Sequence, residues 1–180
     1  MTSQTLLNDY FANHWHRKSG NLDHFNKTGL GLVDKIKSTD RVLDVGCGKN
    51  PFKGLIANLV GIDPAFDEAD VKCTIEEFTT HDLFDVALCL GSINFGSRER
   101  IEQQIAKVIK LLKPVATIYW RCNPGQQDHN NEECKIIDFY PWSVEEHVRL
   151  AEMFGFTLVE CSWDTKNRIY AEWKRMENYV

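Results

Sequence analysis

The stretch Arg41–Asn50 reads RVLDVGCGKN, and VGIDP follows it at residues 60–64. The apolar runs at the start of these two stretches are typical of buried β-strands. Between them, Gly46 and Gly48 allow a tight turn with positive φ angles and a close approach of a ligand to the backbone. Asp63 comes 17 residues after Gly46, where a carboxylate can accept hydrogen bonds from the hydroxyls of a ribose. Together these features predict an adenosine-like ligand across the carboxyl ends of the first two strands.

Short apolar runs alternate with helical patterns along the rest of the chain, which predicts a mostly parallel α/β sheet covered by helices. We expect helices over Ser97–Leu112 and from Ser143, which has capping-box spacing with Glu146, to about Phe154. The last two strands are separated by only a few residues, too few for a parallel crossover, so they should form an antiparallel hairpin. The expected strands are Arg41–Val45, Leu59–Ile62, Val71–Cys73, Phe84–Leu90, Val115–Arg121, Phe156–Ser162 and Asn167–Lys174.

The length of 180 residues fits one domain. Within it, residues 1–38 form an N-terminal helical segment and residues 39–180 the α/β core. Apolar residues at helical spacing between Leu6 and Trp15 predict a first helix, capped by Thr2 or Ser3. A second helix is expected within Leu22–Ile36, although its two glycines disfavour it.

The composition indicates which kinds of partner and which cellular compartment to expect. With 21 basic and 26 acidic residues the net charge is −5, which argues against nucleic acid as the main partner and against a polybasic membrane anchor. No segment approaches the roughly 20 apolar residues that span a bilayer. The six cysteines are scattered, and the first residues lack the charged and apolar regions typical of a secretory leader. We therefore expect reduced thiols in a cytoplasmic protein without a metal site.

Two cofactor classes use a glycine turn followed by an acidic residue. Dinucleotide enzymes require a third glycine at position 51, which is Pro51 here. Asp44, two residues before Gly46, would repel a pyrophosphate but suits a cationic amino-acid group. The pattern therefore favours a sulfonium nucleoside over NAD, and an NAD-dependent oxidoreductase is the least favoured hypothesis.

The sequences VLDVGCG, VGIDP and, at residues 84–91, FDVALCLG resemble the class I S-adenosylmethionine-dependent methyltransferases over roughly residues 41–175. The resemblance implies a Rossmann-like fold of the seven-stranded type, with S-adenosyl-L-methionine as cofactor. It further implies contacts to the methionine part at Asp44, Gly46, Cys47 and Gly48, to the ribose at Asp63, to the adenine at Pro64, Thr74 and Ile75, and to the methyl-transfer side at Leu90 and Gly91.

The chain departs from the family pattern at three places. Asn50 stands at the third glycine of the first motif, and Thr74 replaces the acidic residue that faces the adenine. The fourth motif reads LGSINF at residues 90–95, not the NPPY that accompanies base flipping, so a DNA acceptor is not expected.

No nucleophile–base pair is evident, and the catalytic residues stay unknown. Ser92 and Asn94 follow the fourth strand, where an acceptor should approach, although a plain helix-entry turn explains them equally well. Arg121, which ends the fifth strand, is a candidate for holding an anionic acceptor, and His24 is a candidate base or a surface histidine.

Two segments are candidate covers for the site. Residues 1–38 would act as a lid over the cofactor, or their aromatic side chains simply pack on the sheet. The segment Asn123–Tyr140 is long for a loop and suggests a second lid or binding loop. Its polar residues form a solvated run rather than a metal site: Asp128, His129, Glu132 and Glu133.

The first functional hypothesis is methyl transfer from S-adenosylmethionine to a small-molecule acceptor. The alternative is a protein that binds the cofactor without transferring the methyl group and acts as a regulatory or partner subunit. An RNA or protein acceptor stays open, because net charge does not exclude a local basic patch.

Overall fold

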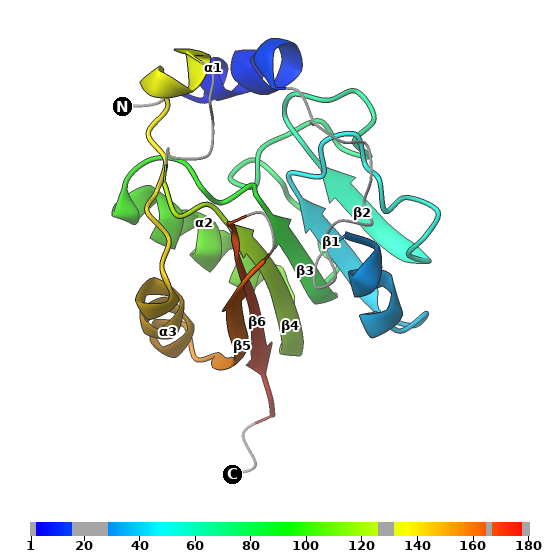
Figure 1. Cartoon of the computed structure of the whole chain (residues 1–180). Coiled ribbons are helices and arrows are strands. Elements are labelled where there is room, and N and C mark those ends of the chain that lie inside the picture. The colour runs from blue at the N-terminus through cyan, green and yellow to red at the C-terminus, as the bar shows by residue number, and fades with distance from the viewer. Residues whose placement is uncertain (1–2, 16–28, 126–131, 165–166, 178–180) are drawn as a thin grey trace.

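Six strands form a single sheet in the order β2-β1-β3-β4-β6-β5 in the computed structural model, which describes residues 3–15, 29–125, 132–164 and 167–177. Strands β2, β1, β3 and β4 are parallel, and β6 runs antiparallel to both β4 and β5 (Figure 1). The mostly parallel sheet and the terminal hairpin are therefore confirmed. The strands are β1 Arg41–Val45, β2 Asn58–Ile62, β3 Phe84–Leu90, β4 Leu112–Cys122, β5 Thr157–Trp163 and β6 Ile169–Arg175.

The expectation of seven strands was wrong, because the segment Val71–Cys73 does not form one. Val71 makes a single parallel bridge to Ile62 at the edge of β2. The preceding residue, Asp70, accepts a hydrogen bond on its carboxylate from the Gly61 amide at 2.8 Å, and a turn begins soon after, at Thr74. Too few residues lie between the Asp70–Gly61 hydrogen bond and the turn at Thr74 to extend the pairing of this segment with β2.

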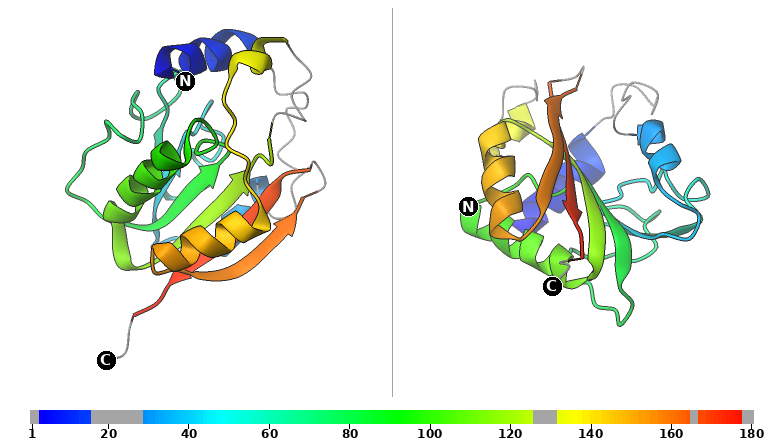
Figure 2. Two further views of the ribbon diagram at one scale, coloured as in Figure 1. Left: turned by 90° about the vertical axis from the view of Figure 1, so that its left-hand side faces the viewer. Right: turned by 90° about the horizontal axis from the view of Figure 1, so that it is seen from below.

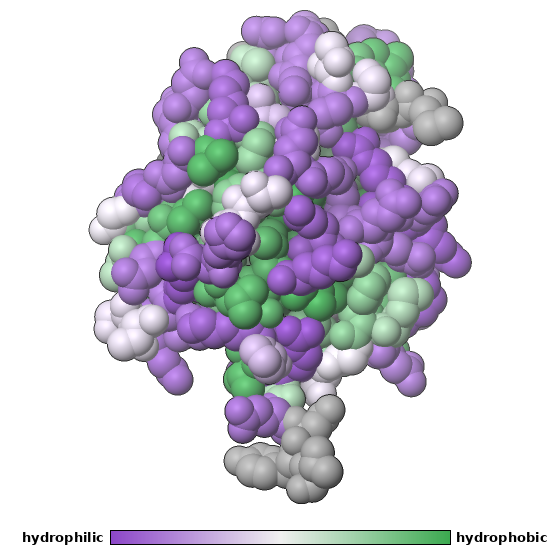
Figure 3. Space-filling view, turned by 180° about the vertical axis from the view of Figure 1, so that it is seen from behind, coloured by the Kyte–Doolittle hydropathy of each residue, from purple (hydrophilic) through white to green (hydrophobic). Residues whose placement is uncertain are grey.

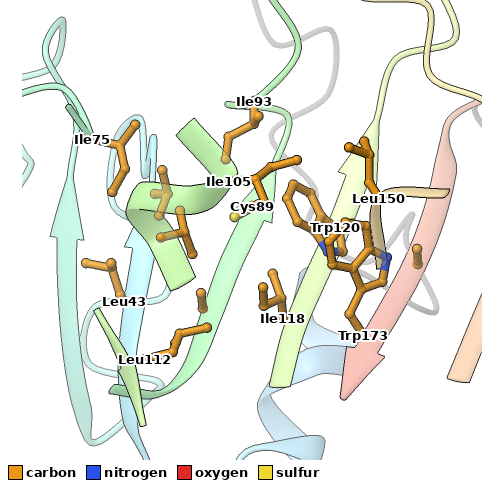
Figure 4. Close-up of a cluster of buried hydrophobic side chains, with 14 of the residues drawn as sticks. Leu43, Ile75, Cys89, Ile93, Ile105, Leu112, Ile118, Trp120, Leu150 and Trp173 are labelled. Atoms are coloured by element: carbon orange, nitrogen blue, oxygen red, sulfur yellow. The ribbon is translucent and has the colours of Figure 1, made fainter. Parts of the chain in front are cut away.

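Helices α2 (Arg98–Lys110) and α3 (Val144–Met153) cover one face of the sheet (Figure 2). Ser97 and Ser143 cap them, since each hydroxyl oxygen accepts from the amide three residues later, at 3.3 and 3.1 Å. The apolar side of each helix packs on the sheet and forms the main core. Figure 4 shows part of this core, including Leu43, Ile105, Ile118, Trp120, Leu150 and Trp173.

His147 lies fully buried among the tryptophans of this core. Its ring stacks on that of Trp142 with centroids 4.5 Å apart, and its Nδ1 accepts a hydrogen bond from Nε1 of Trp173 at 3.2 Å. Burial lowers the pKa of His147 to about 3, so the ring stays neutral. This neutral contact joins α3 to β6.

The opposite face is covered by a smaller apolar cluster that includes Leu32, from the 3-10 helix η3 (Gly29–Lys35). The second predicted helix is thus 3-10 rather than α over its described part, and residues 16–28 lie outside the described residues. Gly29, with a φ of 70°, stands at the first position of this 3-10 helix and is itself outside the helical region. Seen from behind, hydrophilic residues cover most of the surface and hydrophobic ones gather near its centre (Figure 3).

The N-terminal segment lies over the carboxyl edge of the sheet, beside the 3-10 helix η5 (Glu132–Ile136) (Figure 1). It consists of α1 (Gln4–Asp9), capped by Ser3, and a π-helical turn η1 (Tyr10–His14). A separate apolar cluster joins it to η5 and to the loop after β3, and within that cluster the Tyr10 hydroxyl and Cys134 Sγ are hydrogen bonded at 2.8 Å. In the described part of the chain, no helix is both long and apolar enough to cross a membrane.

Candidate functional site

A cavity lies at the carboxyl ends of β1, β2 and β3, and α1 and η1 contribute to its lining. The ends of parallel strands at this sheet edge are where α/β folds bind ligands. Eight of the predicted cofactor residues line the cavity: Gly46, Gly48, Asp63, Pro64, Thr74, Ile75, Leu90 and Gly91.

The turn after β1 has the backbone that its glycines predict. Gly46, Gly48 and Asn50 all have positive φ angles, of 68°, 56° and 55°. The amide of Gly46 donates to the Ile62 carbonyl at 2.8 Å, which ties the turn to β2. Asn50 occupies the third glycine position in a left-handed conformation, which asparagine tolerates better than most residues.

Gly46 is also sterically required. A Cβ at this position would lie 2.3 Å from the Cβ of Ser92, far closer than two carbon atoms can approach. The turn after β1 therefore passes directly against the loop after β3, and both line the cavity.

Asp63 connects the end of β2 to this turn. Its Oδ2 accepts a hydrogen bond from the Gly48 amide at 2.9 Å, and its Oδ1 accepts from the amides of Ala65 and Phe66 at 2.8 and 3.2 Å. A carboxylate has about four acceptor positions, so one is left for a ligand hydroxyl. The carboxylate thus holds the turn in place while it faces the cavity.

Asp44 and Cys47 do not line the cavity, contrary to the expectation that they face the methionine part. Alternation along β1 points Asp44 away from the side of Leu43 and Val45, and burial, with a smaller effect of Asp63, raises its pKa to about 7. Cys47 is buried too, and burial followed by the charge of Asp44 raises its thiol pKa to about 12. Both residues belong to the family motif, but the motif does not predict that their side chains are buried away from the cavity.

Thr74 and Ile75, the residues expected beside the adenine, lie where the chain passes from Val71 into a turn. Thr74 Oγ1 donates to Oε2 of Glu77 at 3.1 Å and accepts from the Glu77 amide at 3.3 Å. Its hydroxyl is therefore committed to this local turn, while Ile75 is buried beside the cavity.

Of the four candidate catalytic residues, the structure brings Ser92 to the cavity, where its Oγ is buried without a hydrogen-bond partner. Asn94 is engaged elsewhere, because its Oδ1 accepts from the Asn123 amide at 3.0 Å. Arg121 donates from Nε to Oδ2 of Asp164 at 2.8 Å and does not line the cavity. His24 lies outside the described residues.

In the segment Asn123–Tyr140, Asp128 and His129 also lie outside the described residues. Glu132 forms an ion pair with Lys135 at 2.7 Å, as a solvated run would. The apolar residues of this segment lie beside η1, where Phe139 packs on Phe95 with ring centroids 5.3 Å apart.

Several cavity residues escaped the motif analysis because they come from helices and connecting loops rather than from strand ends. The spacing of Leu7, Phe11 and Trp15 predicts one helical face, but not the surface which that face covers. No sequence motif indicates that polar side chains of α1 and α2 line the cavity. These additional lining residues include Gln4, Leu7, Asn8, Phe11, Trp15, Phe66, Glu76, Phe95, Arg100 and Gln104.

A scan against protein-family models and a search of curated proteins each found no match. Solved structures are similar at low sequence identity. The N-methyltransferase NodS of Bradyrhizobium japonicum, in complex with S-adenosylhomocysteine, has a TM-score of 0.66 at 16% identity, over 97% of this chain and 98% of that one.

Two further structures agree with this. The magnesium protoporphyrin IX methyltransferase of Synechocystis, with S-adenosylmethionine bound, has a TM-score of 0.64 at 13% identity over 98% of each chain. The 1,6-didemethyltoxoflavin-N1-methyltransferase of Burkholderia thailandensis has a TM-score of 0.63 at 16% identity, over 77% of this chain and 72% of that one. The chain therefore shares the fold of S-adenosylmethionine-dependent methyltransferases, and the Rossmann-like expectation is confirmed.

Proposed function

We propose that the protein is a methyltransferase that uses S-adenosyl-L-methionine to methylate a small molecule. The observation that carries this is the Asp63 carboxylate, which faces the cavity while it is bonded to the Gly48 amide of the turn after β1. This pairing suits a nucleoside whose ribose lies against Asp63 and whose amino-acid end lies along Gly46 and Gly48.

The residues present fit this cofactor. Gly48 has nothing within 4 Å of its Cβ position, so a ligand can approach the backbone of the turn there, and Pro64 and Ile75 offer apolar surface for a base. Pro51 replaces the third glycine that a pyrophosphate needs, which keeps NAD the weaker candidate.

The cofactor would supply an activated methyl group on a sulfonium, so the chain's own residues need mainly to bind and orient. Asp63 would hold the ribose, and the backbone at Leu90 and Gly91 would line the side from which the acceptor comes. Among the described lining residues, Glu76 and Arg100 are already engaged with each other and with neighbouring amides. An acceptor that is nucleophilic without losing a proton first fits this lining best.

A small acceptor fits the apolar surface over the cavity. Phe11 of η1 packs on Phe95 of the loop after β3 with ring centroids 5.4 Å apart, and both line the cavity with Trp15. Closure by such a cover excludes water and large acceptors. Two similar structures are named as methyltransferases of 1,6-didemethyltoxoflavin and of magnesium protoporphyrin IX.

Calorimetry with S-adenosylhomocysteine tests the cofactor. We expect a dissociation constant well below millimolar, competition by S-adenosylmethionine, and a far weaker effect of NAD on the melting temperature. Absence of heat with both sulfur nucleosides would reject the proposal, and a melting shift with NAD alone would favour an oxidoreductase.

A second candidate is a cofactor-binding subunit that does not itself transfer the methyl group. One similar structure, at 14% identity and a TM-score of 0.63, is a complex of a Haloferax volcanii putative methyltransferase with its Trm112 activator. Transfer of labelled methyl from S-adenosylmethionine to any small molecule, RNA or protein by the isolated chain would exclude this candidate. A salt-sensitive reaction would indicate an RNA acceptor.

A further inference from the structure

A buried glutamine faces the cavity from α2. Gln104 is 6% exposed, lies among the apolar residues Ile101 and Ile105 of the core side, and lines the cavity together with Ile75 and Glu76. Glutamine is rarely buried to this extent unless both ends of its amide are satisfied.

The orientation of this amide follows from its neighbour. Nε2 of Gln104 lies 2.8 Å from Oε1 of Glu76, and a carboxylate can only accept a hydrogen bond. The amide nitrogen therefore faces Glu76, and the carbonyl oxygen faces away from it. That oxygen, Oε1, is buried and has no hydrogen-bond partner.

The surrounding contacts hold Glu76 and hence the glutamine. Nε of Arg100 lies 3.7 Å from the same Glu76 oxygen, and Nη2 of Arg100 donates to Oε1 of Gln4 at 2.7 Å. A rotation of the Gln104 amide would direct its oxygen at the carboxylate. Gln104 thus borders the cavity with a buried acceptor that no group of the chain satisfies, and a ligand donor that reaches this oxygen would pair it.

We infer that Gln104 recognises the 6-amino group of the cofactor's adenine through its Oε1. This inference rests on the proposed function. S-adenosylmethionine carries N–H donors at two places, the adenine amino group and the α-ammonium group. The amino-acid end is assigned to the turn at Gly46, whereas Gln104 is bonded to Glu76, the residue after Ile75, whose apolar surface is assigned to the base.

Thr74 is less suited to this role, because its hydroxyl already donates to Oε2 of Glu77 and accepts from the Glu77 amide within a local turn. Gln104 would therefore be the side chain that distinguishes an adenine base from a purine that lacks the amino group. It acts on binding and specificity and takes no part in the transfer step.

The test compares two ligands on the full chain by calorimetry: S-adenosylhomocysteine and its analogue in which the 6-amino group is replaced by hydrogen. This change removes the amino group with its two N–H donors and adds no steric bulk. For the unmodified protein we expect about tenfold weaker binding of the analogue, since a buried acceptor is then left unpaired.

The variant Gln104→Met keeps the length of the side chain and removes the acceptor. We expect it to bind the two ligands with affinities within about twofold of each other. The matched control is Gln103→Met, because Gln103 is the next residue of α2 and its amide donates to Oε1 of Glu99 on the outer face of the helix; it should keep the tenfold ratio.

Equal affinities of the unmodified protein for both ligands would overturn the inference, whether or not the variant folds. A tenfold ratio that persists in Gln104→Met would also overturn it. A protein that binds neither ligand would remove the proposed function itself, which is a different result from binding without discrimination.

Discussion

The Cβ of Ser92 occupies the space that a side chain on Gly46 would need, at 2.3 Å from the ideal Cβ position. The two residues belong to loops after β1 and β3, which are neighbouring strands of the sheet. Their contact closes one side of the cavity and explains why glycine is needed there, beyond its positive φ angle.

Gly46→Ala should therefore destabilise the fold and weaken cofactor binding. The left-handed backbone and the steric overlap together cost about 2–4 kcal/mol in the free energy of unfolding. Urea denaturation measures this loss, and calorimetry with S-adenosylhomocysteine measures the loss of affinity.

Gly54→Ala is the control for this change, because Gly54 has a positive φ of 85° but nothing within 4 Å of its Cβ position. It should cost only the conformational part, about 1–2 kcal/mol. Equal destabilisation by the two alanines would show that the contact with Ser92 is not important.

Asp63→Asn tests the carboxylate that joins the turn to the ribose site. The amide group cannot accept from all three backbone N–H donors, and its NH₂ would face one of them. We expect the affinity for S-adenosylhomocysteine to fall at least about tenfold and the free energy of unfolding by about 1–3 kcal/mol.

Asp67→Asn serves as the comparison, since Asp67 is exposed and forms an ion pair with Lys72. Its affinity for the ligand should match that of the unmodified protein. If Asp63→Asn binds equally well, the ribose does not lie at this carboxylate.

Asp44 predicts a specific dependence of stability on pH. Burial, and then the charge of Asp63, raises its pKa from the ordinary 3.8 to about 7. The folded protein thus holds this proton more tightly than the unfolded chain does. The resulting stabilisation is fully present below about pH 4 and is lost as the pH rises through 7.

Asp44→Asn removes this ionisation. Relative to the unmodified protein, the free energy of unfolding of the variant should rise by roughly 2–4 kcal/mol between pH 4 and pH 8. The difference between the two proteins is the quantity to follow, because the lowered pKa of His147 destabilises both as the pH falls from about 6.5 to 3. A difference that does not change with pH would contradict the buried neutral carboxyl.

Gln4→Ala tests whether α1 acts as a lid. The Gln4 side chain accepts a hydrogen bond from Arg100 at 2.7 Å, which connects α1 to α2 across the cavity lining. Without it the cover should open more often, and the dissociation rate of S-adenosylhomocysteine should rise about three- to tenfold. Stopped-flow displacement of the bound ligand measures this rate. Gln103→Ala on α2 is the control and should leave the rate unchanged. An unchanged rate in Gln4→Ala would mean that α1 is a static part of the core.

The position of the cavity was predictable from the sequence because its determinants are local. A buried strand, a turn that needs positive φ angles and an acidic residue at the end of the next strand are each encoded within a few residues. Parallel pairing then brings the ends of β1 and β2 to the same sheet edge, independently of the structure of the other segments. The terminal hairpin was predictable for the same reason, since a short connection excludes a crossover.

What only the tertiary structure decided is which side chains face the cavity from other elements. Asp44 and Cys47 lie within the motif yet are buried beneath it, and Asn94 is bonded to a backbone amide 29 residues further along the chain. Gln104 and the apolar face of α1 line the cavity without any local motif. Such roles depend on contacts between segments far apart in sequence, and on how packing satisfies or isolates each polar group, so no short pattern of residues encodes them.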